Sequence, residues 1–248
     1  MHFFNEVHLD RQEHRHTTRL RNLDRLEQRL DRRGRLDPDA RAIIAKLRDD
    51  PRDDAWYHTL FSLAPPDKVA GEITPAYSML PTAGVEHMMA INPAVKLILL
   101  LRHPVERAWS GVRFDLRRTW FTDHDEAPDD AQLRKMVFKG NNRRRTAYRS
   151  IVETYRATVP EAQLLIAFYD DIVERPDQLL EDVAAYIGVD PTRFKRAKPD
   201  GNPRPNAAPP VRMPDGLREE LHATYLPDIE WLVANVAGVP RSWLDESR

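Results

Sequence analysis

Residues Lys96–Arg118 read KLILLLRHPVERAWSGVRFDLRR, and this stretch decides the fold. Five of its first six residues are Leu or Ile, a run that is too short to span a membrane and is typical of a strand buried on both faces. Pro104 ends the strand, because proline cannot continue a central strand but fits the first position of a helix. The apolar residues that follow recur at three- and four-residue steps and predict a helix with one apolar face: Val105, Ala108, Trp109 and Val112. The stretch therefore predicts half of a βαβ unit, and ligands bind at the carboxyl ends of such strands.

Two polar residues follow the strand. Arg102 leaves it as a fixed positive charge with a planar fork of donors, which suits a phosphate or a carboxylate. Ser110 comes eight residues later on the predicted helix. Taken singly, an arginine such as Arg102 more often pairs with a nearby acid, and a serine such as Ser110 more often faces solvent. The whole order of strand, Arg, Pro, helix and Ser resembles the 3′-phosphate-binding motif of the sulfotransferases that use 3′-phosphoadenosine 5′-phosphosulfate (PAPS). This resemblance implies that Arg102 and Ser110 hold the 3′-phosphate of the nucleotide.

The resemblance covers nearly the whole chain and carries further expectations. It implies a single domain over residues 1–248 with a P-loop-type, three-layer α/β fold around a central parallel sheet. The implied reaction moves a sulfuryl group from PAPS, the cosubstrate, to a hydroxyl or less often an amine, and it needs no metal. The implied acceptor is a glycan, a glycolipid or a small hydroxylated metabolite.

Composition limits the other possibilities. The chain has 248 residues, with 38 Lys and Arg against 39 Asp and Glu, so no global basic field attracts nucleic acid or an anionic membrane. It has no cysteine, which excludes disulfides and cysteine-based metal sites. The histidines show no HExxH spacing, and the chain has neither a membrane-length apolar run nor a signal-peptide pattern. We expect a cytoplasmic protein that does not bind nucleic acid or insert stably into a membrane, and the oligomeric state stays open.

The segment Lys68–Leu80, KVAGEITPAYSML, predicts a short strand over Val69–Ile73 that turns into a helix at Thr74-Pro75. It resembles a Glu-Lys-(Ser/Thr)-Pro-(Ala/Ser)-Tyr string that lies beside the active site in carbohydrate-type sulfotransferases. The match implies a catalytic role for Glu72. Ile73 stands where that pattern often has lysine, so the role of that cation is not carried over. The alternative for Glu72 is an ordinary acid at a helix start.

The second buried strand is Leu164–Phe168, followed by Tyr169. This order resembles the family's strand that ends in Tyr-Glu-Asp, whose tyrosine lies near the adenine, so Tyr169 is expected to support the adenine ring. A core tyrosine is the alternative. The most basic run, Lys139–Arg149, opens a helix and could face an anionic substrate, although such a run is more often a solvated face.

The C-terminal part is predicted to be helical, with a proline-rich interruption. Pro176 starts a helix that Gly188 ends. Residues 191–214 are irregular, and the resemblance makes Lys195 and Arg204 candidates for a basic loop that closes the nucleotide site. A surface linker is the alternative. A final helix over Leu217–Val236 is expected to be interrupted at Pro227.

The first residues carry the last part of the resemblance. The family has a glycine-rich phosphate loop and, after it, a Lys-Glu-x-His-Phe-Phe-(Asp/Asn) string whose glutamate is the base. Here His2-Phe3-Phe4-Asn5 matches the end of that string, which implies that His2 and Asn5 are active-site residues. The loop, the first strand and the glutamate would then precede residue 1. We therefore expect a truncated chain with a gap in its sheet, a frayed start and little or no turnover.

Two other functions remain open at this point. One is a binding module that keeps the 3′-phosphoadenosine site without turnover, and the other is a P-loop kinase relative that uses another nucleotide. Stabilisation by 3′-phosphoadenosine 5′-phosphate (PAP) but not by ATP or ADP would favour the sulfotransferase.

Overall fold

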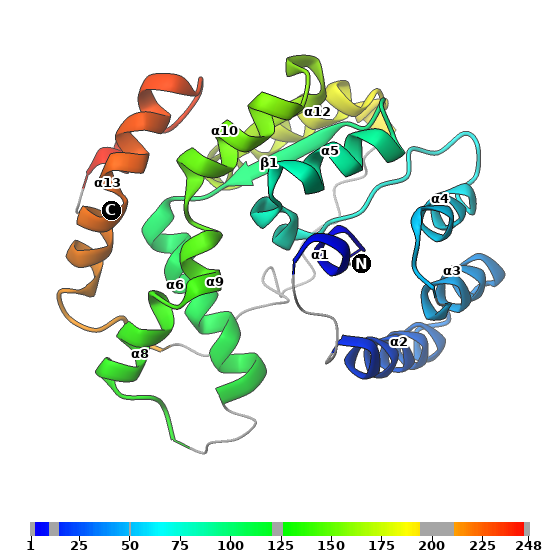
Figure 1. Cartoon of the computed structure of the whole chain (residues 1–248), viewed down its shortest axis with the longest axis horizontal. Coiled ribbons are helices and arrows are strands. Elements are labelled where there is room, and N and C mark those ends of the chain that lie inside the picture. Colours follow the sequence, from blue (N-terminus) through cyan, green and yellow to red (C-terminus); the bar gives the residue numbers. More distant parts are fainter. Residues whose placement is uncertain (1–2, 10–14, 50, 121–125, 194–210, 246–248) are drawn as a thin grey trace. The chain divides into compact units, whose positions relative to one another are not determined.

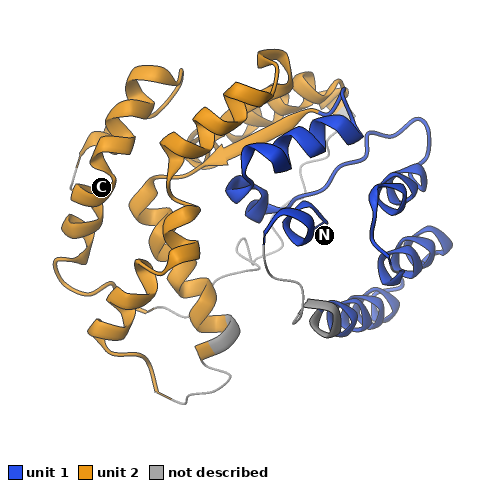
Figure 2. Ribbon diagram, in the orientation of Figure 1, with its two compact units in different colours: residues 1–95 blue, residues 96–248 orange. Residues whose placement is uncertain are grey.

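The computed structural model describes residues 3–9, 15–49, 51–120, 126–193 and 211–245. The chain divides into two compact units, residues 1–95 and residues 96–248, which Figure 2 colours separately. Each unit is described by itself. The prediction of a single domain over the whole chain stays a prediction.

The regular elements of unit 1 are all helices over its described residues, and an irregular segment joins the helix that ends at Ser62 to the 3-10 helix that begins at Pro75 (Figure 1). The pair Asp37-Pro38 is typical of a helix start, with an N-cap acid before a proline at the first helical position. Asp37 does cap this helix of unit 1: its Oδ1 accepts the Ala40 N–H at 2.7 Å, and Pro38 takes the first helical position. The elements are α1 (Phe3–His8), α2 (Arg15–Arg32), α3 (Pro38–Arg48), α4 (Asp54–Ser62), the 3-10 helix η1 (Pro75–Met79) and α5 (Thr82–Ile91).

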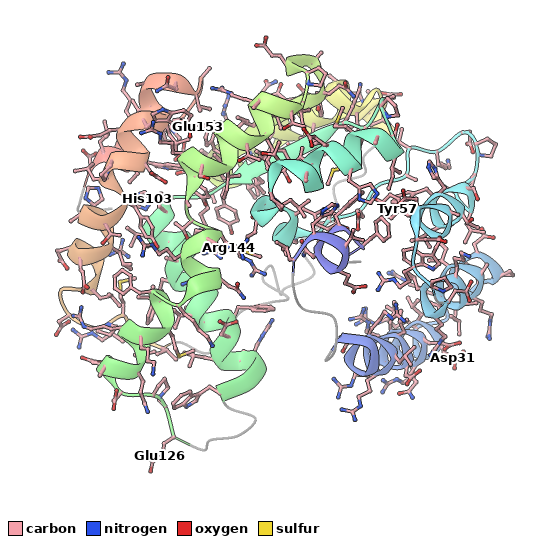
Figure 3. All side chains as sticks on the ribbon, viewed as in Figure 1. Asp31, Tyr57, His103, Glu126, Arg144 and Glu153 are labelled. Carbon is pink, nitrogen blue, oxygen red and sulfur yellow. The ribbon has the colours of Figure 1, made fainter. Side chains whose placement is uncertain are left out.

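An aromatic cluster organises the core of unit 1. Phe3 and Phe4 on α1 are buried, and their ring centroids lie 4.8 and 5.2 Å from that of Tyr57 on α4, which Figure 3 labels. The expectation of a frayed start is therefore wrong from Phe3 onward, because aromatic burial anchors this segment. His2 lies outside the described residues.

The strand predicted over Val69–Ile73 is also wrong, since this segment is irregular. Val69 and Ile73 are exposed, Ile73 to 93%. A strand needs a neighbour to pair with its N–H and C=O groups, and the structure shows none for this segment among the residues it describes. The turn at Thr74-Pro75 does lead into a helix, the 3-10 helix η1.

Unit 2 holds the sheet and the larger set of helices (Figure 1). Its elements are β1 (Leu97–Leu101), α6 (Pro104–Asp115), the π-helical η2 (Leu116–Trp120), α8 (Asp130–Val137), α9 (Gly140–Arg144), α10 (Tyr148–Thr158), η3 (Glu161–Gln163), β2 (Leu164–Phe168), α11 (Tyr169–Glu174), α12 (Pro176–Ile187), η4 (Pro191–Arg193), α13 (Leu217–Asn235) and η5 (Arg241–Leu244).

The two strands run parallel and in step, with Leu97 opposite Leu164 and Leu101 opposite Phe168. Both strands therefore end at the same level. The predicted burial of β1 on both faces is half right: Leu99 and Leu101 are buried, whereas Ile98 and Leu100 are 41% and 49% exposed. Side chains alternate between the faces of a strand, so one face of β1 carries this exposure.

The last helix, α13, packs on α6 and α10. The predicted interruption at Pro227 is wrong, because α13 continues through it. Proline removes one backbone hydrogen bond from a helix, but Leu221, Tyr225 and Ile229 are buried on both sides of it. Tertiary packing of this kind supplies most of the stability of helices in proteins. No helix in the described part of the chain is long and apolar enough to cross a membrane.

Candidate functional site

Arg102 and Tyr169 come together at the carboxyl end of the sheet. Arg102 directly follows β1 and Tyr169 directly follows β2, and the register places these strand ends side by side. The Arg102 guanidinium carbon lies 4.8 Å from the centroid of the Tyr169 ring, within cation–π range. Tyr169 keeps 39% of its surface exposed. This strand end therefore presents a cation beside an accessible aromatic ring.

The Arg102 backbone is fixed by Tyr148, the first residue of α10. Its N–H donates to the Tyr148 hydroxyl at 3.3 Å. Burial raises the pKa of Tyr148 to about 12, so this phenol stays neutral at physiological pH. Tyr148 therefore ties the turn after β1 to α10.

The Arg102 side chain also has an acidic partner. Its Nη2 donates to Glu106 Oε2 at 3.3 Å, one helical turn along α6. The alternative of an ion pair with a nearby acid is thus observed as well. Within the described part of the chain, the Nε and Nη1 groups of Arg102 have no hydrogen-bond partner. These two donor groups are therefore available to bind an anion.

Glu106 contacts a second arginine. Its Oε1 accepts from Arg218 Nη2 at 2.7 Å, and Arg218 lies in the first turn of α13. One carboxylate therefore bridges two guanidinium groups that lie far apart along the chain.

Ser110 lies on α6, eight residues after Arg102. Its hydroxyl makes no hydrogen bond to any of the residues that the structure describes. Three residues before it, Arg107 Nη1 donates to Asn142 O, Asn142 Oδ1 and Thr146 Oγ1, each at 2.7 Å. Burial lowers the pKa of the Arg107 guanidinium, whose hydrogen-bond acceptors here are neutral.

A layer of buried rings lies beneath the strand ends. His103, labelled in Figure 3, is buried with its ring centroid 5.8 Å from that of Trp243. The Trp243 indole N–H donates to the Asp170 carboxylate at 3.3 Å, and its ring also packs on Phe168. Because Asp170 follows Tyr169, this layer fixes the start of α11.

Glu72, in unit 1, is held by three hydroxyl groups. Tyr57 and Tyr77 donate to its Oε1 at 2.8 and 2.9 Å, and Thr74 donates to its Oε2 at 3.1 Å. Burial, followed by the nearby Glu72 charge, raises the pKa values of both phenols above their usual range. The two tyrosines therefore stay protonated and keep donating.

A chain of three side chains lies beside the aromatic cluster of unit 1. His8 Nε2 lies 2.9 Å from His87 Nδ1, and His87 Nε2 lies 2.8 Å from Asp54 Oδ1. Burial, with a smaller effect of His87, lowers the pKa of His8. Asn5, on the same helix as His8, is buried.

The predicted site residues thus fall into three groups. Arg102 and Tyr169 meet at the strand ends, with Ser110 further along α6, whereas Glu72 and Asn5 belong to unit 1. His2, Lys195 and Arg204 lie outside the described residues.

Sequence reasoning missed two residues that contact Arg102, Tyr148 and Glu106, and a third, Arg218, that contacts Glu106. The spacing of four residues from Arg102 to Glu106 was a usable signal, since such residues are neighbours on a helix. The sequence holds no local signal for Arg218, which is distant along the chain.

A model of the sulfotransferase family matches residues 2–193. The chain belongs to the sulfotransferase family. The match contains Arg102, Ser110 and Tyr169, whereas α13 and Arg218 lie beyond it.

A solved structure supports the fold of this sulfotransferase. The crystal structure of a sulfotransferase from Alicyclobacillus acidocaldarius is similar to it with a TM-score of 0.57, 22% identity and coverage of 77% of this chain and 74% of that chain. The parallel pairing of β1 and β2 and this likeness confirm the predicted α/β sulfotransferase fold. No curated protein matches the chain.

Proposed function

We propose that this sulfotransferase moves a sulfuryl group from PAPS to a hydroxyl group of a glycan, a glycolipid or a small metabolite. Family membership supports the transferase class. The observation that carries the nucleotide part is the Arg102 guanidinium over the Tyr169 ring, 4.8 Å from its centroid, at the ends of two adjacent parallel strands. A 3′-phosphorylated adenosine offers one group for each: a phosphate for the cation and a purine for the ring.

The proposed roles follow the donor chemistry of each residue. Arg102 and Ser110 bind the 3′-phosphate, and Tyr169 supports the adenine. Lys195 and Arg204 are proposed to close the nucleotide site from the segment between η4 and α13. His2, Asn5 and Glu72 stay proposed active-site residues, as the resemblance implies.

In the proposed reaction, the acceptor oxygen forms a bond to sulfur while the bond from sulfur to the phosphate oxygen breaks. The acceptor proton passes to a base, and PAP leaves. As in phosphoryl transfer, the protein mainly aligns the attack and stabilises charge on the transferred group and the leaving oxygen. The cytoplasmic location and the absence of nucleic-acid binding remain predictions of the sequence.

Calorimetry and thermal shift with PAP, ATP and ADP test the nucleotide site in the full chain. We expect PAP to stabilise the protein, by about 2.7 kcal/mol at a concentration of 100 times its Kd, and ATP and ADP to do so far less. Arg102→Ala should weaken PAP binding by on the order of 2–4 kcal/mol and Ser110→Ala by about 1 kcal/mol, because charge-assisted and neutral hydrogen bonds are lost. Tyr169→Ala should weaken the binding of every adenosine nucleotide, because each of them carries the purine.

A matched control is Arg149→Ala, which removes an exposed arginine that pairs with Glu153 on α10 at 2.9 Å. This variant should bind PAP like the wild type. Wild-type affinity in a folded Arg102→Ala variant would show that the 3′-phosphate site is assigned to the wrong residue. Equal binding of PAP and ATP would instead favour a kinase relative.

A further inference from the structure

Glu106 holds two arginines with its two oxygens. Oε2 accepts from Arg102 Nη2 at 3.3 Å, and Oε1 accepts from Arg218 Nη2 at 2.7 Å. The three side chains have similar exposure, 32% for Arg102 and Glu106 and 34% for Arg218. They therefore form one partly screened charge cluster.

The charges in this cluster determine how strongly it attracts an anion. Arg102 and Glu106 alone form a neutral pair, in which the carboxylate cancels the cation next to it. With Arg218 the cluster carries a net charge of +1. A carboxylate that is shared between two guanidinium groups repels an incoming phosphate less than one that faces Arg102 alone, because its charge is already compensated.

Packing fixes the position of Arg218. Its neighbours on α13, Leu217 and Leu221, are fully buried, and α13 packs on α6, the helix that carries Glu106. The side chain is thus presented from a supported helix. Arg218 also lies beyond residues 2–193, which match the family model, so the match assigns it no role.

We propose that Arg218 is a positioning residue of the 3′-phosphate site, which acts by holding Glu106. Through this contact it compensates the Glu106 charge and leaves the free Nε and Nη1 donors of Arg102 available to the 3′-phosphate of an adenosine nucleotide. The inference rests on the proposed function, since it takes Arg102 as the phosphate contact.

The competing explanation is that Arg218 only ties α13 to α6. The chain offers a matched control for this. Arg134 on α8 also ties α13 in place, through an ion pair with Glu220 and a hydrogen bond to Asp215 O at 2.8 Å. Arg134→Gln removes an arginine tie of the same helix without changing the charge around Arg102.

The experiment measures the Kd values of PAP and of adenosine 5′-phosphate, which lacks the 3′-phosphate, by calorimetry on the full chain. We expect Arg218→Gln to raise the Kd of PAP about tenfold and to leave the Kd of adenosine 5′-phosphate unchanged. The double variant Glu106→Gln, Arg218→Gln removes both charges and leaves Arg102 as the cation, so it should recover PAP affinity to within about threefold of the wild type. Arg134→Gln should leave both affinities unchanged.

The rescue is compared with the gain that Glu106→Gln gives on its own, because removing this carboxylate lowers the repulsion of the phosphate in any background. A purely structural tie gives only that additive gain, whereas the proposed role of Arg218 gives a larger gain in the Arg218→Gln background than in the wild type. The inference is overturned if the gain in the Arg218→Gln background is no larger than the gain in the wild type. Equal losses for the two nucleotides, or a loss in Arg134→Gln as large as that in Arg218→Gln, would also overturn it. If the wild type binds PAP no better than adenosine 5′-phosphate, the proposed 3′-phosphate site is itself wrong and the inference fails with it.

Discussion

At the scale of single residues, Arg102 is held by contacts of three kinds. Its backbone N–H bonds to Tyr148, its Nη2 bonds to Glu106, and its guanidinium covers the Tyr169 ring. These contacts come from three different elements of unit 2. An arginine loses much side-chain freedom when it binds a ligand, and here part of that entropy is already lost before binding. Such preorganisation raises the affinity of the remaining Arg102 donors for an anion.

The pair His8 and His87 is the clearest pH-sensitive feature among single residues. The 2.9 Å contact joins two ring nitrogens, so at least one of the two must be unprotonated. Burial first, and His87 second, lower the pKa of His8 below its ordinary value of about 6.5. The unfolded chain therefore binds the proton of His8 at a higher pH than the folded chain does.

The sign of the effect on stability follows from this difference. The contribution of His8 is complete above about pH 6.5 and decreases as the pH falls from there toward the folded pKa. We expect chemical denaturation at pH 7.5, 6.5 and 5.5 to show that His8→Gln removes part of the acid-induced loss of stability, by less than about 1 kcal/mol because the site is partly exposed. Glutamine keeps a hydrogen-bond donor for His87 without titrating.

His58→Gln is the control for that measurement, since His58 is an exposed residue on α4. This variant should retain the wild-type dependence on pH. If His8→Gln loses stability on acidification as steeply as the wild type, the contact between the two histidines has no role in it.

At the scale of elements, Asn142 joins α6, α8 and α9. Its Nδ2 donates to Ala108 O and to Val137 O, each at 2.9 Å, and its backbone and side-chain oxygens accept from Arg107. The close approach requires a glycine on α6: a Cβ added at Gly111 would lie 2.2 Å from Asn142 Oδ1. Glycine in the middle of a helix costs about 1 kcal/mol relative to alanine, and the buried hydrogen bonds of Asn142 offset this cost.

Gly111→Ala should therefore destabilise the protein, although the change raises helix propensity. The added methyl group must displace Asn142 or bend α6, and we expect a loss of about 1–3 kcal/mol in the free energy of unfolding, measured with urea. Gly140→Ala, at the start of α9, is the matched control because nothing lies within 4 Å of its added Cβ. A Gly111→Ala protein as stable as wild type would mean that Asn142 can move without cost.

The elements that sequence could predict are those with a strong local signal. The run of Leu and Ile before Pro104 predicts β1 and α6, and Asp37-Pro38 predicts the start of α3, as observed. Val69–Ile73 has a weaker signal, since Gly71 and Glu72 interrupt its apolar residues, and whether such a segment forms a strand depends on a partner that its own residues do not encode. The predicted interruption at Pro227 failed for a similar reason, because the packing of α13 outweighs the local effect of proline.

At the scale of the whole molecule, the candidate site was predictable in so far as it follows strand ends. Parallel strands bring the residues after them to one edge, and this places Arg102 beside Tyr169 without any knowledge of the helices. Arg218 could not be predicted in this way, because its contact depends on how α13 packs on α6. The near-zero net charge of the chain also hides the local excess of positive charge in this cluster.

The division into two units leads to a prediction about where a bound nucleotide stabilises the chain. The described residues proposed to contact PAP, Arg102, Ser110 and Tyr169, all belong to unit 2. Ligand that binds the folded state suppresses the local opening of the elements that hold it. We expect hydrogen–deuterium exchange with saturating PAP to slow in the segments of β1 with α6 and of β2 with α11. The α2 and α3 segments of unit 1 should exchange at the same rate with and without the nucleotide.

Adenosine at the same concentration is the control, because it carries the purine without phosphate. It should slow exchange around Tyr169 at most and leave the α6 segment unchanged, since Arg102 and Ser110 then have no anion to bind. If adenosine slowed exchange in α6 as much as PAP does, the assignment of the phosphate site to Arg102 and Ser110 would be contradicted. A uniform slowing over both units would show that the nucleotide stabilises the chain as one cooperative body, and the strand ends would then not be distinguished as its site.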